Sequence, residues 1–487
     1  MSQTLLAPEA PSRRSSASLT FALLSVSAGS FAMLQSLISP VLPVVQHALH
    51  TSQAGVSWVL IAWLLSASVA TPILGRVGDM IGKEKILLVI LGAIAAGSLV
   101  AAVAPNIGWM VAGRVIQGLG GAVFPVSFGI IRDEYDRRRV PSAIGALASV
   151  IAVGGGIGTV LAGPITAALG WRWLFWIPLI IVVIVGVLCH FFMPESPVRS
   201  GGRINWAASS LLATWLVALL LPVSEGQVWG WASASTIVLF AVAVVAFISW
   251  VAVESRSANP VIDMRMMRQI AVWTTNLVAL LFGASMFSVL TFLPQFLETP
   301  SAAGYGFGSS ITIAGVIILP MLVTMAAGGM ISGPIHHIFG FKAQLAWGSA
   351  FLGAGSLGFA FWNAAPWQVA IGCAVFGLGL GMAYSAMTSV IVQAVPPAQT
   401  GAAAGMNTNI RYIGGGIGTA VVTAVVIATA RPGGLPTAGG YSAGFAVLAA
   451  VGAVAVAASL LIPSARGAAS RRGGDAGQSA PAAPANQ

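Results

Sequence analysis

Long apolar runs alternate with short polar segments along nearly the whole chain. Each run is about 20 residues or longer, which is enough for an α-helix to cross a bilayer, and charged residues, prolines and glycines separate one run from the next. We therefore expect about fourteen membrane-spanning helices. Their expected limits are 19–45, 54–75, 84–104, 107–131, 140–168, 172–193, 205–223, 231–253, 271–298, 309–335, 342–362, 367–393, 401–429 and 441–463.

Composition supports this interpretation. Hydrophobic residues make up 57% of the 487 residues and charged residues only 7%, whereas a soluble domain carries about 25% charged residues. Backbone groups in lipid must bond to each other, so only helices and closed barrels span a membrane, and the unbroken apolar runs do not alternate as barrel strands do. The fold class is therefore an all-α polytopic membrane protein. The two cysteines are expected to be packing residues.

The basic residues predict the orientation. If the amino terminus lies inside the cell, all 22 Lys and Arg residues but four fall in cytoplasmic segments, as the positive-inside rule requires. The exceptions are Arg172 and Arg431 outside and Arg114 and Arg411 within spans. Both termini are then cytoplasmic. This distribution explains the net charge of +10 without a nucleic-acid partner. The excess of Arg over Lys is typical of GC-rich bacterial genomes, so we expect a bacterial plasma membrane.

One hexapeptide, GGGIGT, occurs at Gly154–Thr159 and again at Gly414–Thr419. A dinucleotide-binding loop needs a preceding strand and a following acid, and both copies lack them. Small residues instead let helices pack closely in lipid. The two copies occupy the same place in two halves, which indicates a parallel repeat. The expected parts are a cytoplasmic tail (1–18), a six-helix bundle (19–193), a linker with two extra helices (194–270), a second six-helix bundle (271–463) and a disordered cytoplasmic tail (464–487).

The segment GRVGDMIGKEK joins the second and third expected spans. Its glycines permit a tight turn. Asp79 can cap the next helix or pair with Arg76, and the lysines hold the segment on the cytoplasmic side. The residues of interest are Gly75, Arg76, Gly78, Asp79, Gly82 and Lys83.

This spacing resembles the signature loop of the major facilitator superfamily, with Glu84 where a second basic residue is usual. The resemblance implies two pseudo-symmetric six-helix bundles, here with a central two-helix insertion. It also implies that the loop is a gating loop, which braces the halves in the outward-facing state by charge contacts. That role is carried onto Arg76, Asp79 and Lys83.

A second motif, RVIQGLGGA, begins at Arg114 and resembles the fourth-span motif R-x-x-Q-G-x-G-x-A of the same superfamily. An arginine inside a span is costly and is a functional hypothesis by default. The resemblance implies that Arg114 takes part in proton coupling, with Gln117 beside it. Snorkelling of Arg114, or bonding to backbone carbonyls, is the structural alternative.

The fifth span resembles the antiporter motif, in which glycine and proline kink the helix. The matching kink residues are Gly158, Gly163 and Pro164, while Thr159 and Thr166 depart from the usual glycines. Together with the extra pair of spans, this segment resembles the fourteen-span drug:proton antiporter family, which implies export.

Carboxylates are absent from the expected span interiors. Gln35 stands where the family's first span usually carries Asp. A lipophilic cation needs a buried counter-charge, so we expect a neutral, zwitterionic or anionic substrate. Arg411 adds positive charge to the cavity unless it lies at the cytoplasmic end of its span. The candidates for the cavity lining are Gln35, Trp63, Arg114, Gln117, Asn276 and Arg411.

The sequence thus favours a secondary transporter that exports drugs or specialised metabolites by alternating access. A proton gradient is the expected energy source, with Asp79, Glu298 and His47 as candidate proton sites, and uncoupled export stays open. A lipid or lipid-precursor exporter and a non-transporting receptor or scaffold are the alternatives. Enzyme, cofactor and metal motifs are lacking. The expected partners are a small-molecule substrate and membrane lipid, and we expect a functional monomer.

Overall fold

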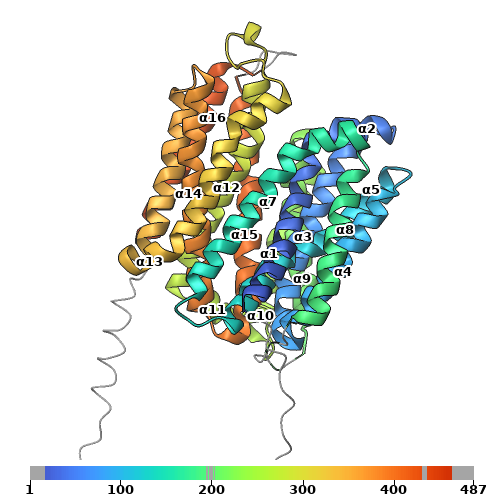
Figure 1. Cartoon of the computed structure of the whole chain (residues 1–487), viewed down its shortest axis with the longest axis vertical. Coiled ribbons are helices and arrows are strands. Elements are labelled where there is room, and N and C mark those ends of the chain that lie inside the picture. The colour runs from blue at the N-terminus through green and yellow to red at the C-terminus, as the bar shows by residue number, and fades with distance from the viewer. Residues whose placement is uncertain (1–16, 194–195, 197–200, 202, 430–435, 463–487) are drawn as a thin grey trace, which may run out of the picture.

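The computed structural model describes residues 17–193, 196, 201, 203–429 and 436–462 (Figure 1). Over these ranges every regular element is a helix. The tail expected at 464–487, most of the tail expected at 1–18 and part of the linker expected at 194–270 lie outside the described residues.

The helices fall into two sets of spans and an insertion. The first set comprises α1 (Ala17–Leu37) with α2 (Leu42–Ala48), α3 (Gln53–Ile81), α4 (Lys83–Ala102), α5 (Ile107–Gly118) with α6 (Val123–Glu134), α7 (Val140–Leu169) and α8 (Trp173–Phe192). The insertion comprises α9 (Trp206–Trp229), α10 (Ala234–Arg256) and the short α11 (Met264–Met267). The second set comprises α12 (Ile270–Glu298), α13 (Ile311–Phe361), α14 (Pro366–Ala394), α15 (Thr400–Ile427) and α16 (Ala438–Leu460).

Helix α13 consists of two spans. Its 51 residues would extend about 75 Å if straight, far beyond the roughly 30 Å hydrocarbon thickness of a bilayer. Gly340 has a non-helical φ of 73° inside it, a conformation that glycine adopts without strain. The described chain has 13 helices long and apolar enough to cross a membrane, and the division at Gly340 raises the number of spans to the expected fourteen.

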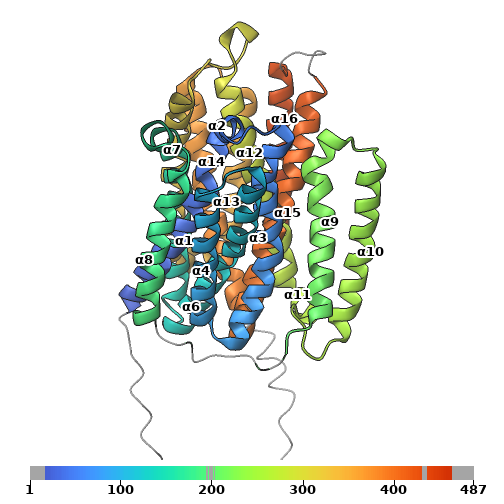
Figure 2. The ribbon, with the colours of Figure 1, turned by 90° about the vertical axis from the view of Figure 1, so that its right-hand side faces the viewer.

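The two sets form bundles with the same internal packing (Figure 1). Helix α1 packs on α7 in the first bundle, and α12 packs on α15 in the second. The bundles meet through α3 against α15 and through the first part of α13 against α7. Figure 2 shows α9 and α10 beside the bundles, with α9 next to α3 and α15 and α10 on the outer side of α9. The expected fold class, two pseudo-symmetric bundles with a two-helix insertion, is confirmed.

The repeated hexapeptide lies at equivalent helix contacts. In each copy a Cβ on the glycine at the first or the fifth position of the hexapeptide would overlap the backbone of the neighbouring helix, α1 for one copy and α12 for the other. Only glycine allows this approach, which is how small residues hold helices together in lipid. The four glycines are Gly154, Gly158, Gly414 and Gly418.

Candidate functional site

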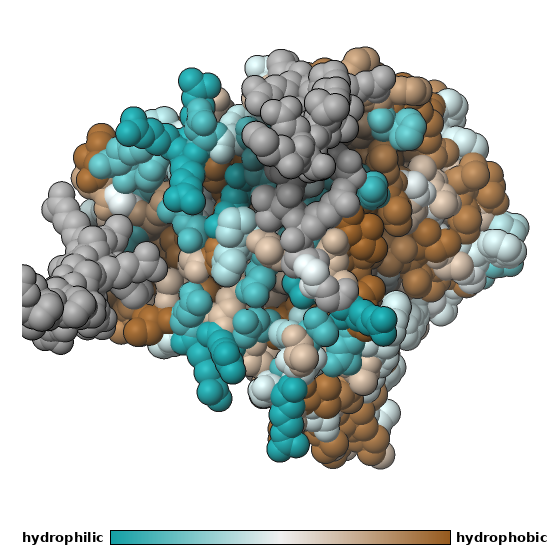
Figure 3. All heavy atoms as spheres, turned by 90° about the horizontal axis from the view of Figure 1, so that it is seen from below, coloured by the Kyte–Doolittle hydropathy of each residue, from teal (hydrophilic) through white to brown (hydrophobic). Residues whose placement is uncertain are grey.

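The end of the molecule at which α3 ends and α15 begins carries many of its charged residues, and we call it the basic end. Figure 3 looks onto this end, where hydrophilic side chains cross the middle of the face and hydrophobic residues lie toward its rims. The hydrogen bonds that join the two bundles, including those of Asp79 and Arg132, lie toward this end. Two lines of contact carry them.

The first seam is the contact of α3 residues 63–79 with α15 residues 401–412. At its basic end Gly75 and Gly401 approach so closely that a Cβ on either would overlap the carbonyl oxygen of the other. One turn farther along, a Cβ on Gly405 would lie 2.9 Å from Thr71 O. Backbone therefore meets backbone, and larger side chains would separate the bundles.

Asp79 joins the two bundles at this seam. Its side chain is fully buried and accepts hydrogen bonds from Gly401 N at 3.2 Å and Ala402 N at 3.1 Å. These amides belong to the first turn of α15, where unpaired N–H groups and the helix dipole favour a carboxylate. The sequence allowed Asp79 to cap the next helix, α4. That alternative is wrong, because Asp79 caps a helix of the other bundle.

Lys83 supplies the counter-charge within the first bundle. Its ammonium lies 2.6 Å from Asp133 Oδ2 and 3.6 Å from Asp79 Oδ1, and both pairs are buried. The neighbouring Glu84, which departs from the family spacing, accepts a hydrogen bond from Ser196 N at 2.9 Å. A buried lysine needs such partners to offset its lost hydration, so the two carboxylates fix its position.

The expected loop at 75–85 is corrected by the structure. Helix α3 continues to Ile81, so Gly75 and Gly78 are helical residues rather than turn residues. Only Gly82 has a positive φ, 128°, and it alone separates α3 from α4. Tertiary packing against Gly401 explains why glycine stands at position 75.

Arg132, on α6 beside the first seam, is a second link between the bundles that the sequence analysis missed. Its guanidinium donates to Thr400 Oγ1 at 2.6 Å and to Val395 O at 2.7 Å, both in the second bundle. The sequence could have indicated this link through the run of charged residues at 132–134, which ends a span. The run includes Asp133, the partner of Lys83.

The second seam is the contact of α7 residues 142–156 with α13 residues 322–333. Small residues line it: a Cβ on Gly145 would overlap Gly329 O, and one on Gly333 would lie 2.5 Å from Ser142 Cα. Ser149 Oγ donates to Ala326 O at 2.6 Å. Among the residues that the structure describes, no ion pair crosses this seam.

Arg114 lies inside the first bundle with no exposed surface. Its Nε donates to Val59 O and its Nη1 to Gln117 Oε1, each at 2.9 Å. Gln117 Nε2 in turn donates to Ser98 Oγ at 2.9 Å. Snorkelling is therefore wrong, while bonding to a carbonyl accounts for one of the nitrogens. Nη2 is buried and has no hydrogen-bond partner among the described residues.

Arg411 is buried inside the second bundle. It is the twelfth residue of α15 and only 4% exposed, so the alternative that placed it at a helix end is wrong. Its guanidinium carbon lies 4.3 Å from the centre of the Tyr384 ring, and Nη2 donates to Thr408 Oγ1 at 3.2 Å. Within the described ranges no carboxylate forms a salt bridge with Arg411 or Arg114.

Aromatic rings connect the surroundings of these arginines across the first seam. The Trp63 ring lies 5.5 Å from the Arg114 guanidinium carbon. It also meets Tyr412 of the other bundle edge-on, with 6.3 Å between ring centres. Tyr412 contacts Phe287 at 6.0 Å. Trp63 was expected as a lining residue, whereas Tyr384 and Tyr412 were not singled out in the sequence.

The other residues expected from the sequence are less closely associated with the surroundings of Arg114 and Arg411. Gln35 is half-buried on α1. Asn276 accepts a hydrogen bond from Asn407 Nδ2 at 2.8 Å, inside the second bundle. In α7, Gly158 packs against α1, whereas Gly163 and Pro164 are exposed on a helix that continues to Leu169.

Acidic side chains of the described spans lie near helix ends. Asp79 and Glu254 each lie within one turn of the end of their helix, and Glu225 lies in the last two turns of α9. Glu298 is the last residue of α12 and is exposed, as is His47 on α2. The middle of every described span is therefore free of carboxylates.

Comparison with known proteins gives a family match. The description of the matching family is Major Facilitator Superfamily, and the match covers residues 24–419. Similar curated proteins include Multidrug resistance protein 3 of Bacillus subtilis (strain 168), 27% identical over 74% of this chain and 70% of that protein. Another is the Tetracenomycin C resistance and export protein of Streptomyces glaucescens, 27% identical over 78% of this chain and 70% of that protein.

Solved structures share the fold. The human organic anion transporter MFSD10 (TETRAN) superposes with a TM-score of 0.64 over 93% of this chain and 100% of its own, at 15% identity. The proton:xylose symporter XylE superposes with a TM-score of 0.65 over 91% and 95% of the two chains, at 13% identity. At such identities the likeness concerns the fold alone.

Proposed function

Because the chain belongs to the Major Facilitator Superfamily, and is therefore a multi-pass membrane transporter of small molecules, we propose that it exports drugs or specialised metabolites by alternating access. The similarity to multidrug and tetracenomycin export proteins supports the direction and the kind of substrate. The family and these relatives are transporters, not enzymes. We further propose the bacterial plasma membrane as its location, since these relatives are bacterial.

The basic end faces the cytoplasm in this proposal. The positive-inside bias supports that orientation, and it makes the two seams a closed cytoplasmic gate. The bundles would then separate at the first and second seams to admit substrate, and would close again when Asp79 caps α15. Alternating access by rocking of two repeats is the general mechanism of such folds.

The substrate is neutral, zwitterionic or anionic. The observation that carries this proposal is the pair of buried arginines, Arg114 and Arg411, in span interiors that hold no carboxylate. A cationic substrate would meet positive charge without compensation, at a cost that desolvation makes large. An anionic group near Arg411 would instead gain a charge-assisted hydrogen bond, and the rings of Tyr384 and Tyr412 would contact an aromatic body.

Proton antiport is the proposed energy coupling. Arg114 supports it through its buried Nη2, which can bond a substrate or water oxygen in one state and not in the other. The exposed positions of Glu298 and His47 make them weaker candidates for a coupling site than Asp79, whose hydrogen bonds to α15 would break if the first seam opened.

Transport in proteoliposomes tests this proposal. The full chain, with a pH gradient imposed, is assayed with an anionic aromatic dye and with a quaternary ammonium dye. We expect transport of the anion, and about a tenfold loss in Arg411→Gln because one charge-assisted bond is lost. Arg256→Gln, an exposed position at the end of α10, is the matched control. Robust transport of the quaternary dye with no effect of Arg411→Gln would contradict the proposed substrate class.

Export of a lipid is the second candidate function. An apolar groove of about 550 Å³ lies between α3, α5 and α9, lined by residues such as Leu65, Val69 and Val115. Its apolar lining would accept an acyl chain. Transfer of a labelled phospholipid between leaflets in the same proteoliposomes, with no dye transport, would favour this candidate over the first.

A further inference from the structure

Asn409 is a fully buried amide in the middle of the first seam. Neither its Oδ1 nor its Nδ2 has a hydrogen-bond partner among the described residues. An asparagine amide both donates and accepts hydrogen bonds, and buried polar groups almost always have at least one partner. Inside a membrane an unpaired amide is especially costly, because there is no bulk water to bond it. This position therefore has hydrogen-bonding capacity that the closed seam leaves unused.

Asn409 faces α3 rather than the interior of the second bundle. It lies four residues after Gly405 and three residues before Tyr412, and both of these contact α3. Residues three and four apart share one face of a helix. The contact of Gly405 with Thr71 lies on one side of Asn409, and the contact of Tyr412 with Trp63 lies on the other. The amide is therefore directed at α3 between these two contacts.

Ser68 is the residue of α3 at this level. It lies four residues before Pro72 and seven before Gly75, which both contact glycines of α15. Its side chain is fully buried, and its Oγ has no hydrogen-bond partner among the described residues. Pro72 has no N–H, so it cannot donate to the Ser68 carbonyl as the fourth residue along a helix normally does. We call Ser68 and Asn409 the mid-seam pair.

The corresponding position of the second seam has a partner. Ser149 lies five residues before one GGGIGT copy, as Asn409 lies five residues before the other. Ser149 Oγ donates to Ala326 O across the second seam at 2.6 Å. A neighbour on α15, Asn407, is also paired, since its Nδ2 donates to Asn276 Oδ1 at 2.8 Å. The unpaired amide is therefore specific to position 409.

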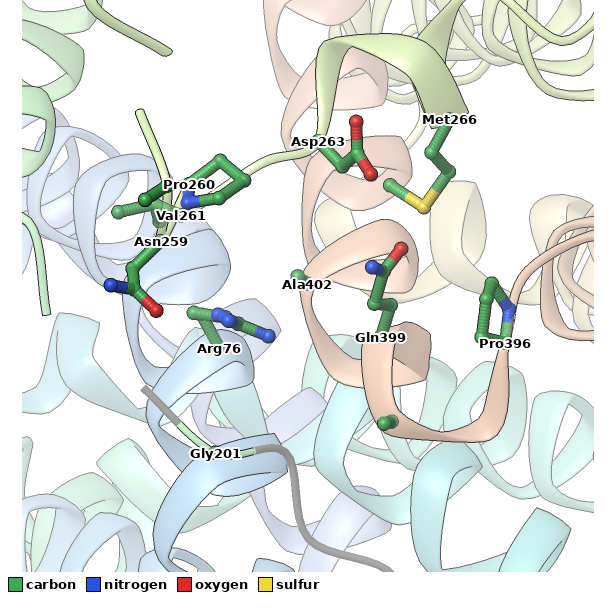
Figure 4. A pocket seen from close by; sticks show the side chains of 12 residues that line it. Arg76, Gly201, Asn259, Pro260, Val261, Asp263, Met266, Pro396, Gln399 and Ala402 are labelled. Atoms are coloured by element: carbon green, nitrogen blue, oxygen red, sulfur yellow. The ribbon is translucent and has the colours of Figure 1, made fainter. Parts of the chain in front are cut away.

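Polar groups at the basic end of the first seam are engaged elsewhere. Figure 4 shows Arg76 and Ala402 there, lining a pocket of about 340 Å³. Arg76 interacts with the charges of Asp79 and Glu254, and Ala402 N donates to Asp79. Asn409 lies about two turns of α15 beyond Ala402. The unused hydrogen-bonding groups are thus deeper in the seam than this pocket.

The depth of the mid-seam pair is that of a transport site. Asn409 is the tenth residue of α15, and Ser68 is the sixteenth of the 29 residues of α3. A rise of about 1.5 Å per residue places Asn409 about 14 Å from the start of its helix. That is close to the middle of a hydrocarbon layer roughly 30 Å thick. Transporters built from two repeats bind their substrates near this level.

We propose that Asn409, with Ser68 opposite, recognises a neutral hydrogen-bonding group of the transported molecule, an inference that rests on the proposed export function. When the first seam opens, both side chains face the space between the bundles. The amide of Asn409 offers a donor and an acceptor side by side, so it matches a group that does the same, such as a carboxamide. A site built to hydrogen-bond such a group discriminates against analogues that lack it.

Transport by the full chain in proteoliposomes tests this recognition. The probes are two fluorescent anions, 5-acetamidonaphthalene-1-sulfonate and 5-propylnaphthalene-1-sulfonate, which have the same charge and about the same size. We expect the parent protein to prefer the acetamido probe. Asn409→Leu should reduce that preference about fivefold, because a hydrogen bond to the substrate is lost, and Ser68→Ala should reduce it less. An unchanged preference in both variants would overturn the proposal.

Thermal unfolding of the same variants in detergent separates recognition from a structural role. Leucine is about as large as asparagine and needs no hydrogen-bond partner, so Asn409→Leu should raise the unfolding temperature. Asn407→Leu is the matched control on the same helix, and it should lower the temperature because it leaves Asn276 unpaired. A lower unfolding temperature in Asn409→Leu would show that the amide has a structural partner, and it would overturn the proposal.

Labelling with a water-soluble maleimide tests exposure of position 409 without any substrate. The parent protein is the blank, since Cys189 and Cys373 are buried. We expect Asn409→Cys to react when it is combined with Asp79→Ala, which weakens the first seam, and Asn407→Cys to stay unreactive in the same background. An unreactive Asn409→Cys would overturn the proposal. Its reaction in a protein that transports neither probe would contradict the proposed anionic substrate class and still support the mid-seam pair as part of the passage.

Discussion

The two seams between the bundles have the same geometry and different chemistry. Each joins a helix of one bundle to a helix of the other, and each brings glycine backbones into direct contact, at Gly75 with Gly401 and at Gly145 with Gly329. The first seam adds a buried carboxylate that caps α15, and beside it Arg132 of α6 bonds to the second bundle. The second seam adds one serine hydroxyl.

This difference indicates how pseudo-symmetric halves acquire unequal roles. Backbone contact between small residues gives shape complementarity without a strong preference for one state. A buried charge that caps a helix of the other bundle is stabilising only while the seam is closed. If the seam opened and left this charge buried without partners, its lost hydration would destabilise that state. The insertion reinforces the asymmetry, since α9 packs against α3 and α15, the helices of the first seam. We expect the first seam to set the stability of the closed gate.

The largest effect is expected for Asp79→Ala. The change leaves Lys83 with one carboxylate and two α15 amides uncapped, which should destabilise the closed gate by about 3 kcal/mol, or about 100-fold in its equilibrium. Transport should fall accordingly, measured as dye export from proteoliposomes. The exposed Asp136→Ala is the control. Normal export by Asp79→Ala would show that the cap has no role in the cycle.

A smaller effect, similar in size for the two variants, is expected for Gly75→Ala and Gly145→Ala. In each variant the new Cβ overlaps a carbonyl oxygen across its seam, and overpacking of this kind costs about 2 kcal/mol. Gly155→Ala, on α7 with open space around it, should behave as the parent protein. The measurement is the accessibility of engineered cysteines at the basic end. An effect of one variant without the other would mean that the seams also differ in geometry.

The smallest effect is expected for Ser149→Ala. The variant loses the hydrogen bond from Ser149 Oγ to Ala326 O, which is worth about 1 kcal/mol at most in net terms. Export should decrease severalfold or less in the same dye assay. A loss as large as that of Asp79→Ala would place an essential contact on the second seam and remove the distinction between the two.

The sequence predicted the spans well because each is a continuous apolar run bounded by glycine, proline or charge. It also predicted the parallel repeat from the two hexapeptides. It misplaced the end of α3, since the glycines at 75 and 78 with charged neighbours look like a loop. Gly75 allows the close approach of α15. Continuation of the helix there depends on tertiary packing that no local pattern contains.

The contacts of the site were harder to predict from the sequence than the spans. The acceptors and donors at the first seam, such as Asp79 and Gly401, are separated by 322 positions, so their pairing follows only from the folded arrangement. The depth of Arg411 was ambiguous because the polar residues before it could belong to a helix end. The structure instead extends α15 from Thr400 and buries that polar stretch.

Distances between spin labels across both seams test the central claim most directly. One pair is placed at Ile81 and Pro397, and the other at Arg138 and Ile338, all exposed at the basic end. We predict short distances in both pairs for the parent protein, a large population of longer distances in both pairs for Asp79→Ala, and little change for Ser149→Ala. Equal changes in the two variants, or no change in Asp79→Ala, would contradict the claim that the first seam holds the gate.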